Sequence, residues 1–138
     1  MHLLIYIFIF LQCGSKPNNY IAPQAFVGFQ KNSIKIDKNN HADLKKILLF
    51  FEEHKEGSIE IAGYRDSTEK ENISLERAIT VKKYLIKNGV DKSKIDTVEG
   101  GSKKSNLFIE IQLENETSKK RKSAITRGRV VTFMIISL

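Results

Sequence analysis

Apolar residues recur at helical spacing in two stretches of this chain. In the first, apolar positions at i, i+3, i+4 and i+7 lie opposite a charged face, which predicts a helix with its N-cap at Asn40 and its end at Gly57. The second stripe ends at Asn88–Gly89, a pair typical of a left-handed C-cap. This second helix starts either at the capping box that Thr68 opens or close to Ser74.

Around these helices the pattern changes to that of strands. Runs of alternating or continuous apolar residues, rich in β-branched side chains, occupy 21–29, 58–63, 95–98, 107–113 and 129–138. The last run is apolar enough to predict burial on both faces, whereas the polar segment 114–127 predicts a solvated loop. Because a strand–helix–strand unit leaves its two strands parallel, we predict an α/β two-layer fold with a mixed sheet.

The N-terminus carries a different signal. Leu3–Leu11 is an unbroken apolar run that ends just before Cys13 and is shorter than the roughly 20 residues that a membrane-spanning helix needs. It is typical of a signal peptide, with an uncleaved anchor or a hydrophobic N-terminal strand as the alternatives. We therefore divide the chain into a signal segment 1–12, a tether 13–23 and a domain 24–138.

Composition narrows the classes of function. The formal net charge of +7 comes from 23 Lys and Arg against 16 Asp and Glu, which favours anionic partners or reflects a Lys-rich solvated surface. The three histidines do not cluster and a single cysteine forms no internal disulfide, so we expect no metal site. The chain has no nucleophile elbow and no phosphate-binding glycine loop, so we expect neither an enzyme nor a cofactor.

Two charged residues form the candidate site. Asp66 follows the strand 58–63, and Arg77 lies in the first turns of the second helix. Ligand groups tend to gather beyond the carboxyl ends of parallel strands. Together a carboxylate and a guanidinium suit a ligand that carries an ammonium and a carboxylate on one carbon. The simpler interpretation makes Asp66 a turn residue and Arg77 a surface residue of an amphipathic helix.

The motifs around these residues resemble a known family. Gly63-Tyr64-x-Asp66, then Ile73-Ser74-x-x-Arg77-Ala78, and finally Arg129-Val130 are similar to the OmpA-like peptidoglycan-binding domain of OmpA, the Pal lipoproteins and the MotB stators. The resemblance implies a β-α-β-α-β-β order with two helices on one face of the sheet. It also implies that Asp66 and Arg77 hold the diamino acid of the peptidoglycan stem peptide, diaminopimelate or another. Arg65, Asn72 and Arg129 are the further residues expected to bind this ligand.

The N-terminal segment resembles the export signal of a bacterial lipoprotein, in which the cysteine after the apolar run is acylated. This implies a palmitate-type anchor on Cys13 in the outer membrane, with the domain facing the periplasm. The expected partners are peptidoglycan, the membrane and envelope proteins, and no nucleic acid. The alternatives are an interaction module of the same fold that has lost wall binding, or a basic domain that binds anionic lipid or nucleic acid through Lys119–Lys122.

Overall fold

The computed structural model describes residues 25–102 and 118–138. Cys13 and the predicted strand 107–113 lie outside the described residues. The elements in chain order are β1 (Phe26–Gly28), η1 (Lys38–Asn40), α1 (His41–Glu53), β2 (Ser58–Tyr64), α2 (Ile73–Lys87), η2 (Lys92–Lys94), β3 (Ile95–Gly101), α4 (Lys119–Thr126) and β4 (Val130–Ser137).

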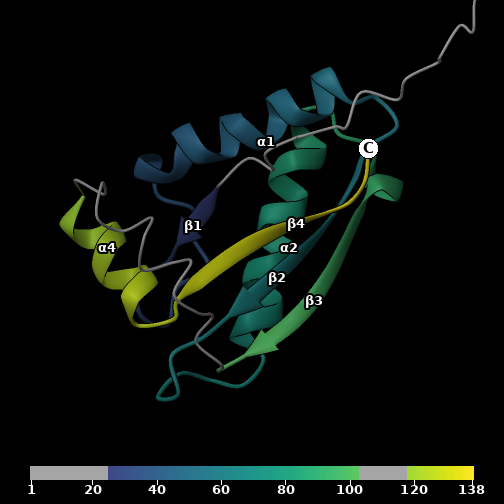
Figure 1. Cartoon of the computed structure of the whole chain (residues 1–138). Helices are drawn as coiled ribbons and strands as arrows, with labels where there is room; N and C mark the ends of the chain where they lie inside the picture. The colour runs from purple at the N-terminus through teal and green to yellow at the C-terminus, as the bar shows by residue number, and fades with distance from the viewer. Residues whose placement is uncertain (1–24, 103–117) are drawn as a thin grey trace, which may run out of the picture.

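The described strands form one mixed sheet in the order β1-β4-β2-β3 (Figure 1). β2 and β3 are parallel neighbours connected through α2. β4 lies between β1 and β2 and is antiparallel to both. β1 and β2 therefore run in the same direction without touching, as the strand–helix–strand rule predicts, and the predicted α/β fold with a mixed sheet is confirmed.

One apolar core joins α1 and α2 to the sheet. Burial alternates along β2, so that Ile59 and Ile61 point to the same face. They share a buried cluster with side chains from both helices, namely Leu44, Ile47, Phe50, Phe51, Ala78, Val81 and Leu85. The predicted placement of two helices on one face of the sheet follows from this shared core.

The start of α2 decides where the loop after β2 ends. The helix begins at Ile73, so the start near Ser74 is confirmed and the capping box at Thr68 is wrong. Thr68 instead donates its backbone N–H and its hydroxyl to Asp66 Oδ1, both at 3.0 Å. The sheet and α2 approach so closely that a Cβ on Gly63 would lie 1.8 Å from the carbonyl oxygen of Ser74. Only glycine fits at this point of β2.

Asn40 is at the N-cap position of α1, as predicted, but its side chain serves another purpose than capping. It precedes α1, but its side chain makes no capping hydrogen bond. The fully buried amide instead accepts from the backbone N–H of Gly28 at 3.0 Å and donates to the carbonyl oxygen of the same residue at 3.1 Å. Both polar groups of this β1 residue are thereby satisfied by one side chain, which fixes β1 against the start of α1.

The predicted solvated loop at 114–127 is wrong for residues 119–126, which form α4. Ser118 caps this helix by accepting from the backbone N–H of Arg121. Arg121 is buried and pairs with Asp43 at 2.6 Å, while Ala124 packs close to Gly28. The polar composition misled the prediction because the helix is held by a buried arginine rather than by a broad apolar stripe.

β4 is confirmed as a strand, but the prediction that both its faces are buried is wrong beyond its first residues. Val130 and Val131 are buried, whereas Met134 is 57% exposed and Ile136 is 51% exposed. The three-residue β1 pairs only with the stretch Val130–Thr132. Among the described strands, the second half of β4 therefore has β2 as its one neighbour.

Candidate functional site

Asp66 lies just beyond the carboxyl end of β2, as predicted. Its side chain is 17% exposed, and Oδ1 is engaged by Thr68, whereas Oδ2 faces Arg129 at 3.7 Å. The hydrogen bonds from the backbone and the hydroxyl of Thr68 hold the pKa of Asp66 below its usual value against the opposing effect of burial, and Arg129 and Lys31 lower it further. Asp66 is therefore a carboxylate at neutral pH.

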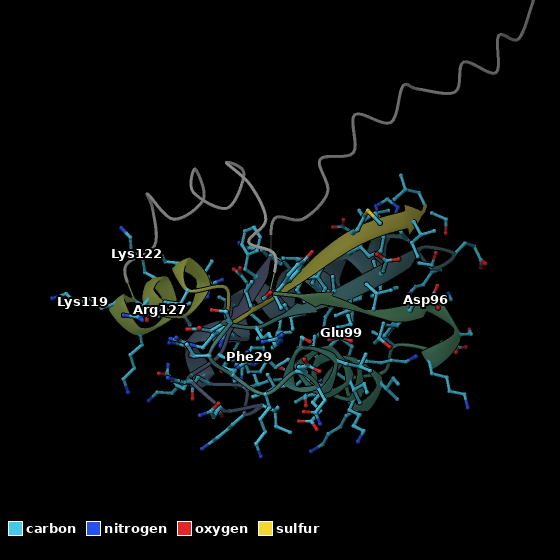
Figure 2. All side chains as sticks on the ribbon, turned by 90° about the horizontal axis from the view of Figure 1, so that it is seen from below. Phe29, Asp96, Glu99, Lys119, Lys122 and Arg127 are labelled. Carbon is cyan, nitrogen blue, oxygen red and sulfur yellow. The ribbon has the colours of Figure 1, made fainter. Side chains whose placement is uncertain are left out.

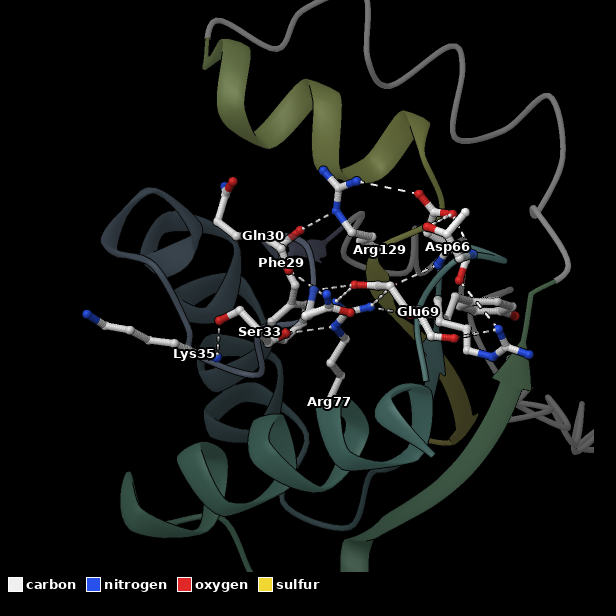
Figure 3. Close-up of polar contacts among 12 residues, drawn as sticks. Phe29, Gln30, Ser33, Lys35, Asp66, Glu69, Arg77 and Arg129 are labelled. Atoms are coloured by element: carbon white, nitrogen blue, oxygen red, sulfur yellow. Dashed lines mark hydrogen bonds and ion pairs between the residues drawn. The ribbon is translucent and has the colours of Figure 1, made fainter. Parts of the chain in front are cut away.

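Arg77 projects from α2 into the loops above it and is fully buried (Figure 3). Its Nε donates to the carbonyl oxygen of Ser33 at 3.0 Å, and its two terminal nitrogens donate to the carbonyl oxygens of Tyr64 and Gln30 at 3.2 and 3.1 Å. The same two nitrogens also donate to Glu69 at 2.8 and 2.6 Å. A guanidinium has five N–H donors, so all of them are used by the chain itself.

Glu69 is the residue of this site that the sequence analysis missed. Its side chain has no exposed surface and forms a bidentate ion pair with Arg77. It also accepts from the backbone N–H groups of Asn32 at 2.7 Å and Asp66 at 2.9 Å. Burial raises the pKa of Glu69, but the hydrogen bonds from Arg77 and from these two N–H groups outweigh it, so the pKa is lowered. Glu69 thus fills a complete carboxylate-binding site inside its own domain.

Arg129 reaches the same place from the sheet, at the residue before β4. Its Nε donates to the carbonyl oxygen of Phe29 at 2.9 Å, and its Nη1 faces Asp66 (Figure 3). Burial lowers the pKa of Arg129, while the carboxylates of Glu69 and Asp66 oppose this shift. An arginine remains charged in proteins, so Arg129 supplies a fixed positive charge behind Asp66.

A hollow of about 210 Å³ opens beside Asp66. Its lining combines one carboxylate, two guanidinium groups and two hydroxyls, from Arg65, Asp66, Ser67, Ser102 and Arg127. Arg65 Nη1 donates to the carbonyl oxygens of Asp66 and Glu69, and its Nε is buried without an acceptor among the described residues. This mixture of opposite charges suits a small zwitterionic group.

The structure does not bring all of the predicted residues to this hollow. Asn72 is exposed, donates to Glu76 Oε1 at 2.8 Å and lines a separate depression with Asn32 and Lys70. Arg65, Asp66 and Arg129 lie together, while Arg77 lies beneath them with Glu69. Within residues 25–102 and 118–138, no group of three or more His, Cys, Asp and Glu side chains is placed to hold a metal ion.

Sequence reasoning had little chance of finding Glu69. The glutamate lies in a polar stretch between a strand and a helix, where charged residues are usually solvated. The partners that bury it come from three places in the chain, the loop after β1, the end of β2 and α2. A weak signal was the position of Glu69, a carboxylate in the short connection between Asp66 and Arg77.

The described elements form an α/β domain in which charged side chains gather beyond the carboxyl end of β2. The chain belongs to the OmpA family, whose family model matches residues 28–124. The resemblance drawn from the Gly63, Arg77 and Arg129 motifs is therefore confirmed.

Solved structures of other proteins share this fold. The chain is similar to the peptidoglycan-associated lipoprotein of Burkholderia pseudomallei, with 18% identity, a TM-score of 0.63 and coverage of 87% of this chain and 97% of that one. It is also similar to the C-terminal domain of MotB from Helicobacter pylori, with 22% identity, a TM-score of 0.55 and coverage of 83% and 86%. An outer membrane protein of Borrelia burgdorferi is similar as well, with 22% identity, a TM-score of 0.57 and coverage of 80% of this chain and 84% of that one. At these identities the similarity shows the fold, and no curated protein sequence matches.

Proposed function

We propose that this chain binds peptidoglycan non-covalently and holds the envelope membrane and the cell wall together. The proposal is supported by its membership of the OmpA family and by a fold similar to that of a peptidoglycan-associated lipoprotein. The module binds without turnover, so it is not an enzyme. The ligand is the diamino acid of the stem peptide, and a polymer that presents many such stems strengthens the attachment.

The observation that carries this proposal is the environment of Asp66. Its carboxylate keeps one oxygen clear of Thr68 at the edge of a hollow whose other charged groups are arginines. An ammonium of the stem peptide pairs with Asp66, and the carboxylate on the same carbon meets a guanidinium. Charge-assisted hydrogen bonds of this kind contribute roughly 1.5–3 kcal/mol each.

Direct capture of the ligand by Arg77 stays a prediction from the sequence. It requires that the ligand's carboxylate replaces Glu69, because every donor of Arg77 is already used. Arg77 also positions Asp66 indirectly, because it binds Glu69, and Glu69 accepts a hydrogen bond from the backbone N–H of Asp66. This second role needs no movement of the buried pair.

The test is co-sedimentation of the full chain with purified sacculi. We expect Asp66→Ala to weaken binding about 10- to 100-fold, as the loss of one charge-assisted hydrogen bond implies. Asp91→Ala is the matched control, because Asp91 accepts from the backbone and hydroxyl of Ser93 just as Asp66 accepts from Thr68. Equal binding by the wild type and Asp66→Ala, with both folded by circular dichroism, would contradict the proposal.

We further propose that the membrane attachment is a lipid on Cys13, in the outer membrane and facing the periplasm. No helix within the described residues is long and apolar enough to cross a bilayer. Two or more acyl chains form a stable anchor, because each buried methylene contributes about 0.8 kcal/mol. Labelled fatty acid should enter the protein and should be absent from Cys13→Ser, and label retained in that variant would exclude this site.

Two alternatives each have an observation in their favour. The saturation of Arg77 by Glu69 favours an interaction module that has lost wall binding, which predicts that Asp66→Ala has no effect in sedimentation. The exposed lysines of α4, Lys119, Lys120 and Lys122, favour binding to anionic lipid or nucleic acid. That function predicts a steep loss of affinity with salt and no dependence on Asp66.

A further inference from the structure

Arg77, the guanidinium expected to bind the ligand's carboxylate, is already occupied by Glu69. Glu69 takes both terminal nitrogens of Arg77 and the backbone N–H groups of Asn32 and Asp66, and neither side chain of the ion pair has exposed surface. A carboxylate that displaced Glu69 would make the same hydrogen bonds and would have to move the loop that carries it. Glu69 is also attached to the domain, so it competes at a high effective concentration.

The free positive charge lies at the rim of the hollow. Arg127 is the residue after α4, and its side chain is exposed. Its backbone N–H donates to the carbonyl oxygen of Ser123, and within the described residues its guanidinium has no ion-pair partner. Arg65 lines the same hollow, and its Nη1 donates to the carbonyl oxygens of Asp66 and Glu69.

We infer that Arg127, assisted by Arg65, binds the carboxylate of the ligand's amino-acid head group, while Asp66 binds its ammonium. This inference rests on the proposed wall binding and assigns the part expected of Arg77 to a different residue. The lining of the hollow supports it, because Asp66 and Arg127 border the same 210 Å³ space together with the hydroxyls of Ser67 and Ser102. A planar guanidinium suits a carboxylate through paired N–H donors.

The arrangement predicts a chemical preference. A diamino acid whose terminal amine shares its carbon with a carboxylate, as in diaminopimelate, engages both Asp66 and Arg127. A lysine or ornithine side chain ends in an ammonium alone and engages Asp66 only. With the excess of positive charge around Asp66, the lone ammonium is the poorer ligand.

The experiment measures binding of the full chain to sacculi with diaminopimelate in their stems and to sacculi with lysine. We expect the wild type to bind the diaminopimelate sacculi at least fivefold more tightly than the lysine sacculi. Arg127→Ala should reduce this preference to less than twofold, because it weakens binding to the diaminopimelate sacculi alone. Lys122→Ala is the control, because Lys122 is an exposed cation of α4 outside this hollow (Figure 2). It should preserve the wild-type preference.

The outcomes separate the inference from the function on which it rests. If Arg127→Ala keeps the wild-type preference while Asp66→Ala abolishes binding, wall binding stands and the role of Arg127 is wrong. If Arg127→Ala and Lys122→Ala both weaken binding to the two walls by similar factors, general charge attraction replaces the specific contact. If the wild type binds neither wall, the proposed function fails and the inference fails with it. Arg127 is exposed, so its removal should leave the melting temperature unchanged within a few degrees.

Discussion

Replacing Arg77 with alanine removes the most heavily bonded side chain of the site. The change leaves the Glu69 carboxylate buried without its counter-ion and deprives the carbonyl oxygens of Gln30, Ser33 and Tyr64 of a donor. It also removes the guanidinium that lies 5.2 Å from the ring centroid of Phe29. The loop after β1 and the end of β2 thereby lose their common hydrogen-bond donor.

The expected loss of stability is large for a domain of this size. Removing one member of a buried ion pair costs about 3–5 kcal/mol, because the remaining charge keeps its desolvation penalty without compensation. A domain typically has only about 5–15 kcal/mol of stability in total. At about 4 °C per kcal/mol, the melting temperature should fall by about 12–20 °C.

Urea unfolding followed by far-ultraviolet circular dichroism measures this change, since the chain has no tryptophan to serve as a fluorescent probe. Lys83→Ala, an exposed change on the same helix, should stay within about 0.5 kcal/mol of the wild type. In the double variant with Glu69→Ala, the loss should be smaller than the sum of the single losses by about 1–3 kcal/mol. A loss below about 1 kcal/mol for Arg77→Ala, or strict additivity, would refute the view that this pair organises the loop.

Two further predictions concern pH and packing. Because the folded-state pKa of Glu69 is lowered, its contribution to the free energy of unfolding is fully present above the ordinary carboxyl pKa of about 4.3 and is lost as the pH falls through the folded value. Glu69→Gln should therefore flatten the acid side of a plot of stability against pH more than Asp91→Asn does. Equal curves for the two variants would argue against the stabilising role of the Glu69–Arg77 pair. Gly63→Ala should destabilise the domain by at least about 1–3 kcal/mol, because the added Cβ would overlap the carbonyl oxygen of Ser74. Gly89→Ala should cost less, because the space around Gly89 is open and only its φ of 99° is unfavourable for alanine. The reverse order in urea unfolding would contradict the close packing of α2 on β2.

The periodic parts of the fold were predictable. A helix stripe and a strand alternation report which face of an element is buried, and that information is local to α1, α2, β2 and β3. The position of Asp66 followed from the same reasoning, because a residue just after a strand lies at the edge of the sheet wherever the strand packs. The family motifs then linked Asp66 to Arg77 before any contact was known.

What each charged side chain touches depended on segments that are distant in the chain. Arg77 is bound by carbonyl oxygens 44 and 47 residues before it, and Arg121 in α4 is bound by a residue 78 positions away. The hydrophobic pattern does not encode such contacts, since a polar residue in the sequence looks identical whether its side chain is hydrogen-bonded to water or to a buried partner. Glu69, α4 and the hollow beside Arg127 therefore emerged only when the loops were folded together, because burial of a charge is a property of all the segments that enclose it.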